Sequence, residues 1–429
     1  MNYKLRTSTL ASIWLALAVS SLFIGAELSL GLVKIRPFDL LLVVFTLFLI
    51  WAQTKNYYYL RPITPTSMAV SGCLILFAVS RLLSGIVTSS TVSAIKEATQ
   101  FAEYILFFFV VVSITGTATS RDKFFQALFF CMLMIGLVNA ALHVADGHFM
   151  GFKRNDEPKL VYGLSTLLSF HWYLRSRNNN DANKNFFTLI FWVSFLLMML
   201  SGERKGWLAF LVSWVVYVYL SNKYCGLRFI ALNFRGARVA LVVGVLVAAI
   251  GVSALSGSGY LSKQIGSFNE IYTIVIDREV PQDMEDVVSR SNVARSFLLF
   301  FSFQMIRENP VFGVGTDQFK KHISQYTDDQ WFVKGVHNEY LRILVENGVV
   351  GFFAFFLFLV VAVFSGIIKL RNSSVSDTGN LCLALALFFY GMVINFFLGG
   401  GALNILFYML PAALLSSFGK TKKGKAFEQ

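Results

Sequence analysis

Long apolar runs recur along the chain and are separated by short polar segments. Because a hydrocarbon core about 30 Å thick needs about 20 apolar residues in a helix, runs of this length predict membrane-spanning helices. The pattern predicts about twelve of them, and hence an all-α integral membrane protein. The predicted spans cover residues 9–28, 36–53, 68–88, 95–115, 124–143, 160–174, 186–201, 206–221, 239–255, 348–368, 380–398 and 401–418.

One interruption, residues 257–347, is long enough to fold outside the membrane. Within it, Ser291 or Asn292 is predicted to cap a helix that ends before Pro310. Its apolar part, residues 297–306, is too short to span, so we expect this helix to lie in the membrane interface or to pack on the mouth of the bundle. The predicted parts are a transmembrane bundle of about nine helices over 1–256, the large loop over 257–347, helices ten to twelve over 348–418 and a basic tail over 419–429.

Composition and charge support this class of protein and predict its orientation. The 429 residues are 56% hydrophobic and 14% charged, whereas soluble domains carry roughly 25% charged residues. With the N-terminus inside, the predicted cytoplasmic segments hold about half of the 37 Lys and Arg residues but few of the 24 Asp and Glu residues. Both termini are therefore predicted to be cytoplasmic, with the large loop on the opposite side. This topology accounts for the net charge of +13, which does not indicate nucleic-acid binding.

Cysteine and histidine positions predict neither a disulfide in the large loop nor a metal site. The four cysteines lie in predicted spans or in a cytoplasmic segment, and none lies in the large loop. That loop contains two histidines, His322 and His337, without the spacing of metal ligands. We therefore expect no metal and no cofactor.

Two short outer loops carry more positive charge than the positive-inside rule favours. Lys153 and Arg154 lie in the first of these loops, and Arg204 and Lys205 lie in "SGERKGW". A negatively charged ligand on the outer side would explain them. Alternatively, Arg204 reaches for lipid headgroups or pairs with a neighbouring acid, and the first loop is neutralised by its own acids. Arg295, in the large loop, is either part of the same cationic set or a plain helix-surface charge.

The segment "VHNEYLRILVENGVVG" places a polar cluster at the entrance of the tenth predicted span. His337 has the side chain best suited to accept a proton at neutral pH, because the unperturbed pKa of histidine is about 6.5. On a helix, His337 would share one face with Tyr340 and Leu344. A structural histidine without a catalytic role is the alternative.

Taken together, "SGERKGWLAF", "ENPVFGVGTDQF" and "HNEYLRILVENGVVG" resemble the O-antigen ligase superfamily of bacterial envelope enzymes. The resemblance covers the chain from about Ser201 to Gly351. It implies a GT-C-like glycosyltransferase architecture and glycan transfer from a polyprenyl pyrophosphate carrier to a hydroxyl, without metal or nucleotide. Members of the superfamily include ligases, repeat-unit polymerases and protein O-glycosylating enzymes.

The resemblance also implies roles for individual residues. Arg204 and Arg295 match donor-binding arginines, with Arg204 also catalytic, and His337 matches the catalytic histidine. Because this chain reads "GERKGW", either Arg204 or Lys205 could contact the donor. Arg154 is a further pyrophosphate-binding candidate. The supporting residues implied are Asn338, Glu339, Gly313 and Gly315.

The leading interpretation is an O-antigen ligase activity that transfers a glycan from undecaprenyl pyrophosphate to a hydroxyl of the lipid A-core at the periplasmic face of the inner membrane. An O-antigen polymerase or a protein O-oligosaccharyltransferase would share the donor but use another acceptor. A multi-span transporter is a further alternative from a different class. Transporters typically place ionisable residues or broken helices at mid-membrane, whereas the charges here gather at the outer rim with Arg81 as the main exception.

Overall fold

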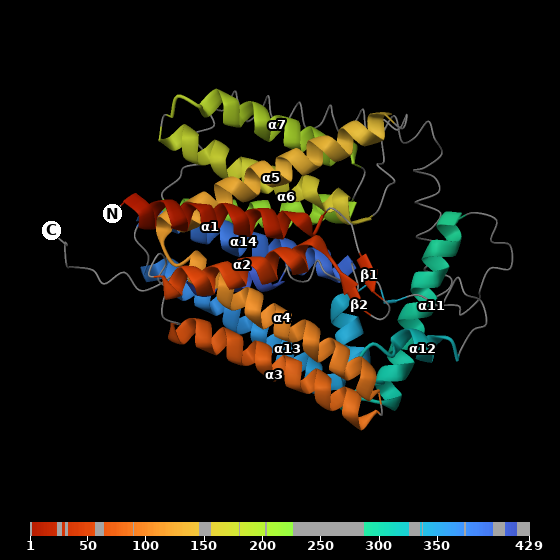
Figure 1. The fold of residues 1–429 in the computed structure, drawn as a ribbon. Coiled ribbons are helices and arrows are strands. Elements are labelled where there is room, and N and C mark those ends of the chain that lie inside the picture. Colours follow the sequence, from red (N-terminus) through yellow and green to blue (C-terminus); the bar gives the residue numbers. More distant parts are fainter. Residues whose placement is uncertain are drawn as a thin grey trace.

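The computed structural model is a helical bundle with a short hairpin and two further helices at one end (Figure 1). The described helices are α1 (Asn2–Ser21), α2 (Pro37–Thr54), α3 (Pro65–Val87), α4 (Thr91–Ile114), α5 (Ala118–Ala145), α6 (Asp156–Asn178), α7 (Lys184–Leu200), α8 (Arg204–Leu220), the π-helix η1 (Ser221–Cys225), α11 (Val287–Glu308), α12 (Phe319–Ile323), α13 (Glu339–Asn372), α14 (Val375–Phe397) and α15 (Leu410–Ser417). The structure describes residues 2–23, 28–30, 33–55, 64–88, 90–145, 156–179, 181–201, 204–225, 287–325, 335–336, 338–372, 375–397 and 408–417.

Helix lengths and hydropathy show a multi-span membrane protein. Within the described residues, six helices are long and apolar enough to cross a membrane, and α1 and α7 contain shorter apolar helices. Each predicted span coincides with a described helix, apart from 239–255 and the first part of 401–418, which lie outside the described residues. The six helices are Pro37–Thr54, Pro65–Val87, Val92–Ile114, Ala118–Ala145, Glu339–Arg371 and Asp377–Phe397.

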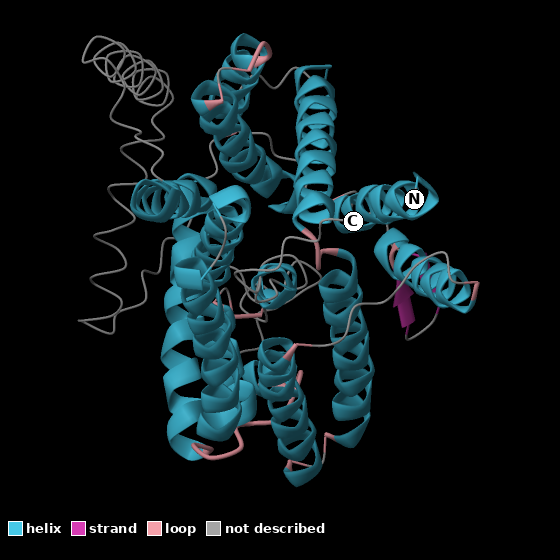
Figure 2. Cartoon of the chain, turned by 90° about the vertical axis from the view of Figure 1, so that its left-hand side faces the viewer, coloured by secondary structure: helices cyan, strands magenta, loops and turns pink. Residues whose placement is uncertain are grey.

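The bundle has two distinct ends. Helices α11 and α12 lie at one end, which we call the outer end, and α1 begins at the opposite, inner end (Figure 1). Figure 2 looks at the molecule from the inner end and shows that helices make up nearly all of the described chain. Packing joins helices distant in sequence, because α13 lies against α3 and α14 lies against α8.

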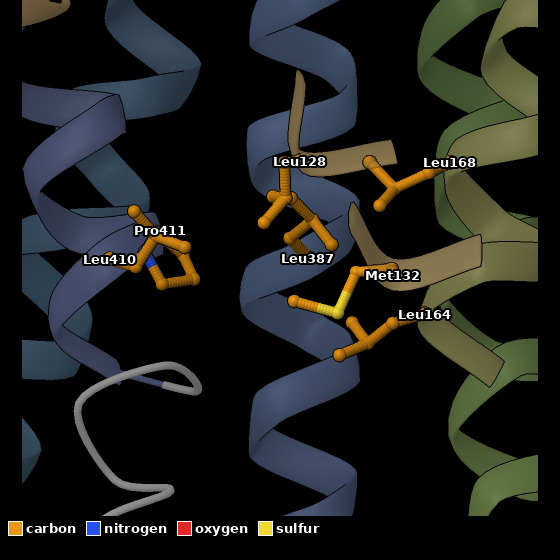
Figure 3. A pocket seen from close by; sticks show the side chains of 7 residues that line it. All are labelled: Leu128, Met132, Leu164, Leu168, Leu387, Leu410 and Pro411. Atoms are coloured by element: carbon orange, nitrogen blue, oxygen red, sulfur yellow. The ribbon is translucent and has the colours of Figure 1, made fainter. Parts of the chain in front are cut away.

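The interior between α5, α6, α14 and α15 is closely packed. Seven apolar side chains surround a void of about 10 Å³ there, and Figure 3 shows them pointing towards one another. A void of this size holds about one water molecule. A glycan or lipid therefore does not fit between these helices. The side chains are those of Leu128, Met132, Leu164, Leu168, Leu387, Leu410 and Pro411.

The fold is all-helical as predicted, apart from a short two-stranded hairpin at the outer end. Strands β1 (Leu28–Leu30) and β2 (Val33–Ile35) pair antiparallel between α1 and α2. The first predicted span was extended to residue 28, but α1 ends at Ser21. Apolar residues at alternate positions of these strands resemble the apolar run of a helix when only hydrophobicity is counted.

The helix of the large loop is longer than predicted. Helix α11 already begins at Val287, so the prediction that Ser291 or Asn292 caps it is wrong. Its C-terminal end before Pro310 is as predicted. In Figure 1 it runs across the ends of α3, α4 and α13, at the mouth of the bundle. Its buried face includes Leu298 and Met305, which belong to a small apolar cluster with residues of α12 and α13.

The segment α13 consists of two helices that meet at Gly348. The first begins at Glu339 and the second is the membrane span, which was predicted to begin at residue 348. Gly348 has φ 63° and ψ −166°, so the helix is kinked there. Positive φ of this kind is readily adopted only by glycine.

Candidate functional site

The predicted site residues that the structure describes lie at the outer end. Arg154 and His337 lie outside the described residues. Arg204 is the first residue of α8, which places its backbone at the outer end of that helix. Lys205 is half-buried on the same turn, and Arg295 is exposed on α11. The backbone of Arg204 and the side chains of Lys205 and Arg295 therefore lie at this end.

Asn338 caps the first turn of α13. Its side-chain oxygen accepts a hydrogen bond from the backbone N–H of Leu341 at 3.0 Å, and its carbonyl accepts one from Arg342 at 2.9 Å. These bonds satisfy N–H groups that have no partner within the helix. The cap fixes the backbone of the residue that directly follows His337.

A chain of alternating charges extends from this cap into the bundle. Arg342 donates to Glu339 at 2.6 and 2.9 Å and to Glu346 at 3.3 Å. The Glu346 carboxylate also lies 3.6 Å from a guanidinium nitrogen of Arg81 on α3, and both side chains are only 3% exposed. The Arg81 guanidinium also lies over the rings of Phe77 and Phe101, at 5.8 and 5.6 Å. The four charged groups neutralise one another, as burial requires.

The Gly-x-Gly turn packs directly on the kink of α13. The backbone N–H of Val314 donates to Val345 at 2.9 Å, and that of Gly315 donates to Glu346 at 3.0 Å. Gly313 has φ 71°, and a Cβ atom there would lie 2.4 Å from the Val345 carbonyl oxygen. At the kink, a Cβ on Gly348 would lie 2.2 Å from the Val311 carbonyl oxygen. The predicted turn is confirmed, and its glycines allow two backbones to touch.

Polar side chains of α3 complete this junction. The Ser84 hydroxyl lies 2.6 Å from the carbonyl oxygen of Phe312 and 2.8 Å from that of Glu346. Thr316 donates to the carbonyl oxygen of Arg81 at 2.8 Å, and Asn347 donates to the Thr316 hydroxyl at 2.9 Å. The turn, α3 and α13 therefore form one hydrogen-bonded unit, which we call the outer junction.

An open groove of about 420 Å³ lies beside the outer junction. It runs between the end of α3 at Val87 and Thr88, the turn over 309–314, and His322. The pKa of His322 lies below its ordinary value because partial burial disfavours the charged imidazole, and Lys321 adds to the effect. His322 is therefore mainly neutral at pH 7.

Sequence reasoning missed most residues of the outer junction. Arg81 was noted only as an exception, and Ser84, Thr316 and Asn347 received no role. The available signal was weak, since a charged residue inside an apolar run indicates a buried partner but does not identify it.

Other ion pairs lie at the inner end. Arg121 pairs with Asp377, joining the start of α5 to α14. Arg175 on α6 binds Asp122 through two hydrogen bonds of 2.5 and 2.7 Å. Charged pairs therefore mark both ends of the bundle. Among the described residues, no group of three or more His, Cys, Asp and Glu side chains could hold a metal ion.

The fold and the outer junction define a multi-span helical membrane protein with a buried polar unit beneath its outer face. Residues 189–356, from α7 to the membrane part of α13, match the family model described as O-antigen ligase (Wzy_C). The chain thus carries the O-antigen ligase family domain, as its motifs predicted, and members of this family are membrane enzymes that transfer glycans. No curated protein is matched by the sequence.

Proposed function

We propose that this protein is an O-antigen ligase, which transfers a glycan from undecaprenyl pyrophosphate to a hydroxyl of the lipid A-core at the periplasmic face of the inner membrane. The match of residues 189–356 to the O-antigen ligase family is the observation that carries the proposal. The fold supports it, because the motifs at the starts of α8 and α13 both lie at the outer end of the bundle. A lipid-linked donor and a lipid-linked acceptor could both arrive there.

The chemistry assigns two tasks to the outer end. The acceptor oxygen forms a bond to the anomeric carbon, the bond from that carbon to the pyrophosphate oxygen breaks, and the pyrophosphate leaves with the electron pair. The leaving pyrophosphate would be stabilised by Arg204 and Arg295, with Lys205 and Arg154 as further cations. A guanidinium group suits this task because it can donate two parallel hydrogen bonds to phosphate oxygens. His337 would take the proton that the acceptor hydroxyl loses.

The lipopolysaccharide profile of a deletion strain tests the proposal. We expect the strain to lose all glycan-capped lipopolysaccharide and to accumulate polymer on the lipid carrier, and the intact gene to restore capping. A surviving band of core plus one repeat unit would instead indicate a polymerase. Normal lipopolysaccharide together with unglycosylated envelope proteins would indicate a protein O-oligosaccharyltransferase. Normal export of every glycan without any defect in transfer would contradict all three enzymes.

A further inference from the structure

We infer that the buried pair formed by Arg81 and Glu346 is a positioning element for the transfer site, holding against the rest of the bundle the first turn of α13, which follows His337 in the chain. The inference rests on the proposed function for what the site does. Arg81 and Glu346 are positioning residues here, because neither is placed in contact with substrate.

The pair connects the interior of the bundle to the start of α13 through an unbroken series of contacts. Glu346 lies 3.6 Å from Arg81 and 3.3 Å from Arg342, and Arg342 in turn binds Glu339 at 2.6 Å. Glu339 is the first residue of the helix, directly after the Asn338 cap. A change at Arg81 therefore reaches Glu339, the second residue after His337, through the side chains of Glu346 and Arg342.

The burial of the Arg81–Glu346 pair indicates that the pair does more than stabilise the fold. Taking two charges out of water offsets much of their attraction, so a well-packed apolar pair of similar volume is often as stable as a buried ion pair. Ion pairs fix geometry more strictly than apolar contacts do, because a charge has few acceptable partners at that depth. Backbone and hydroxyl bonds already hold the outer junction together, since Ser84 and Gly315 bind the Glu346 carbonyl oxygen and not its carboxylate.

Because the backbone of Glu346 makes these bonds, its carboxylate can be removed while the outer junction is kept. The double variant Arg81→Met/Glu346→Leu removes both charges at similar volume and leaves every backbone hydrogen bond of residue 346 available. We expect it to insert and to melt within a few degrees of the wild type. Hydrogen exchange at the amides of Leu341 and Arg342 should become faster, because Arg342 loses its hydrogen bond to the Glu346 carboxylate.

Kinetics of the purified variants measure the effect on transfer. We expect kcat to fall about a hundredfold, the effect of a displacement near 1 Å at a reacting centre, while KM for the lipid-linked donor stays unchanged. The matched control is Arg121→Met/Asp377→Leu, which removes the buried ion pair at the inner end. At matched amounts of folded protein, this control should keep wild-type kcat and wild-type exchange at Leu341.

Two results would overturn the inference. Unchanged exchange at Leu341 and Arg342 in the double variant would show that the pair does not hold the start of α13. Wild-type kcat would show that holding it does not matter for transfer. If the double variant does not reach the membrane, Glu346→Gln, which keeps the volume and loses the charge, is judged by the same criteria. The exchange measurement needs no substrate, so it decides the positioning role even if wild-type protein transfers no glycan and the proposed function fails.

Discussion

Asn338 and Glu339 follow His337 in the chain, and both have a structural task in α13. Asn338 caps the helix and Glu339 binds Arg342. Their supporting role in transfer stays a prediction. The cap satisfies backbone N–H groups of the first turn. The motif that contains the catalytic candidate His337 therefore also contains residues that stabilise the start of the adjoining helix.

Replacement of His337 tests the proposed base. We expect His337→Ala to insert normally and to lose transfer activity by about a hundredfold to ten-thousandfold, the usual contribution of general acid–base catalysis. The measurement is turnover of purified enzyme with a lipid-linked donor. His322→Ala, a change of the second histidine in the large loop, is the matched control and should stay active. Turnover near the wild-type rate in His337→Ala would remove the base assignment.

Arg→Lys changes at Arg204 and Arg295 test whether these two side chains bind the pyrophosphate. If Arg204 and Arg295 bind the pyrophosphate, lysine keeps the charge but loses the two-pronged geometry, so each variant should lose about 2–4 kcal/mol of transition-state stabilisation. The two losses of free energy should not add in the double variant, because both arginines would bind the same pyrophosphate group. Arg307→Lys, an exposed arginine on the same helix as Arg295, is the control. Wild-type activity in both single variants would assign these arginines to lipid headgroups.

At the scale of elements, the turn over 309–317 and the kink of α13 depend on each other. Gly313 and Gly348 are placed where the partner backbone leaves no room for a Cβ atom. The sequence predicted a tight turn from Asn-Pro and Gly-x-Gly. It could not predict that the turn packs on Gly348, because that contact depends on how α13 and α3 pack.

The change Gly313→Ala should destabilise the protein by more than about 1 kcal/mol, because the positive φ and the contact with Val345 both oppose a side chain. The midpoint of thermal unfolding in detergent measures this. Gly72→Ala is the control, since its Cβ would have no atom within 4 Å and alanine favours the helix more than glycine does. Equal midpoints for Gly313→Ala and wild type would show that the turn can move away from α13.

The exposed face of α11 predicts contact with lipid. Leu299, Phe300 and Phe303 are 41%, 54% and 53% exposed, and Arg295 and Arg307 lie one turn beyond this stripe at either end. An apolar stripe with basic ends is typical of a helix in the membrane interface. A photo-crosslinker at position 303 should therefore form adducts with lipid in membranes. The same group at Glu308, outside the stripe, should form few, and equal yields at both positions would contradict an interfacial orientation.

At the scale of the whole molecule, the helices alternate in direction, so that the α3–α4 connection and the starts of α8 and α13 share the outer end. The predicted orientation would place this end on the periplasmic side. The arrangement of the helices also gives the buried Arg81 a partner at the outer end. Because Glu346 neutralises Arg81, this arginine is better explained as part of the packed structure than as part of a transport pathway through the bundle.

Fusions to reporter proteins test the topology. We expect green fluorescent protein to fluoresce when fused after residue 429, and alkaline phosphatase to be active when fused at residue 270, because the first folds in the cytoplasm and the second in the periplasm. The positive-inside distribution is the reason. Exchanging the two reporters is the control and should silence both. Active phosphatase at residue 429 would place the C-terminus outside and invert the site.

The sequence by itself determined the class of the protein, the positions of most helices and the family domain over residues 189–356. These properties depend on local quantities, since each apolar run and each basic loop meets the membrane on its own. Only the tertiary structure decided that Glu346 meets Arg81 and that Ser84 binds the Glu346 carbonyl oxygen across 262 residues of sequence. Such contacts arise from the packing of helices against one another. Many pairings of apolar faces suit the same hydrophobic pattern, and the close fit of small and polar side chains selects one of them.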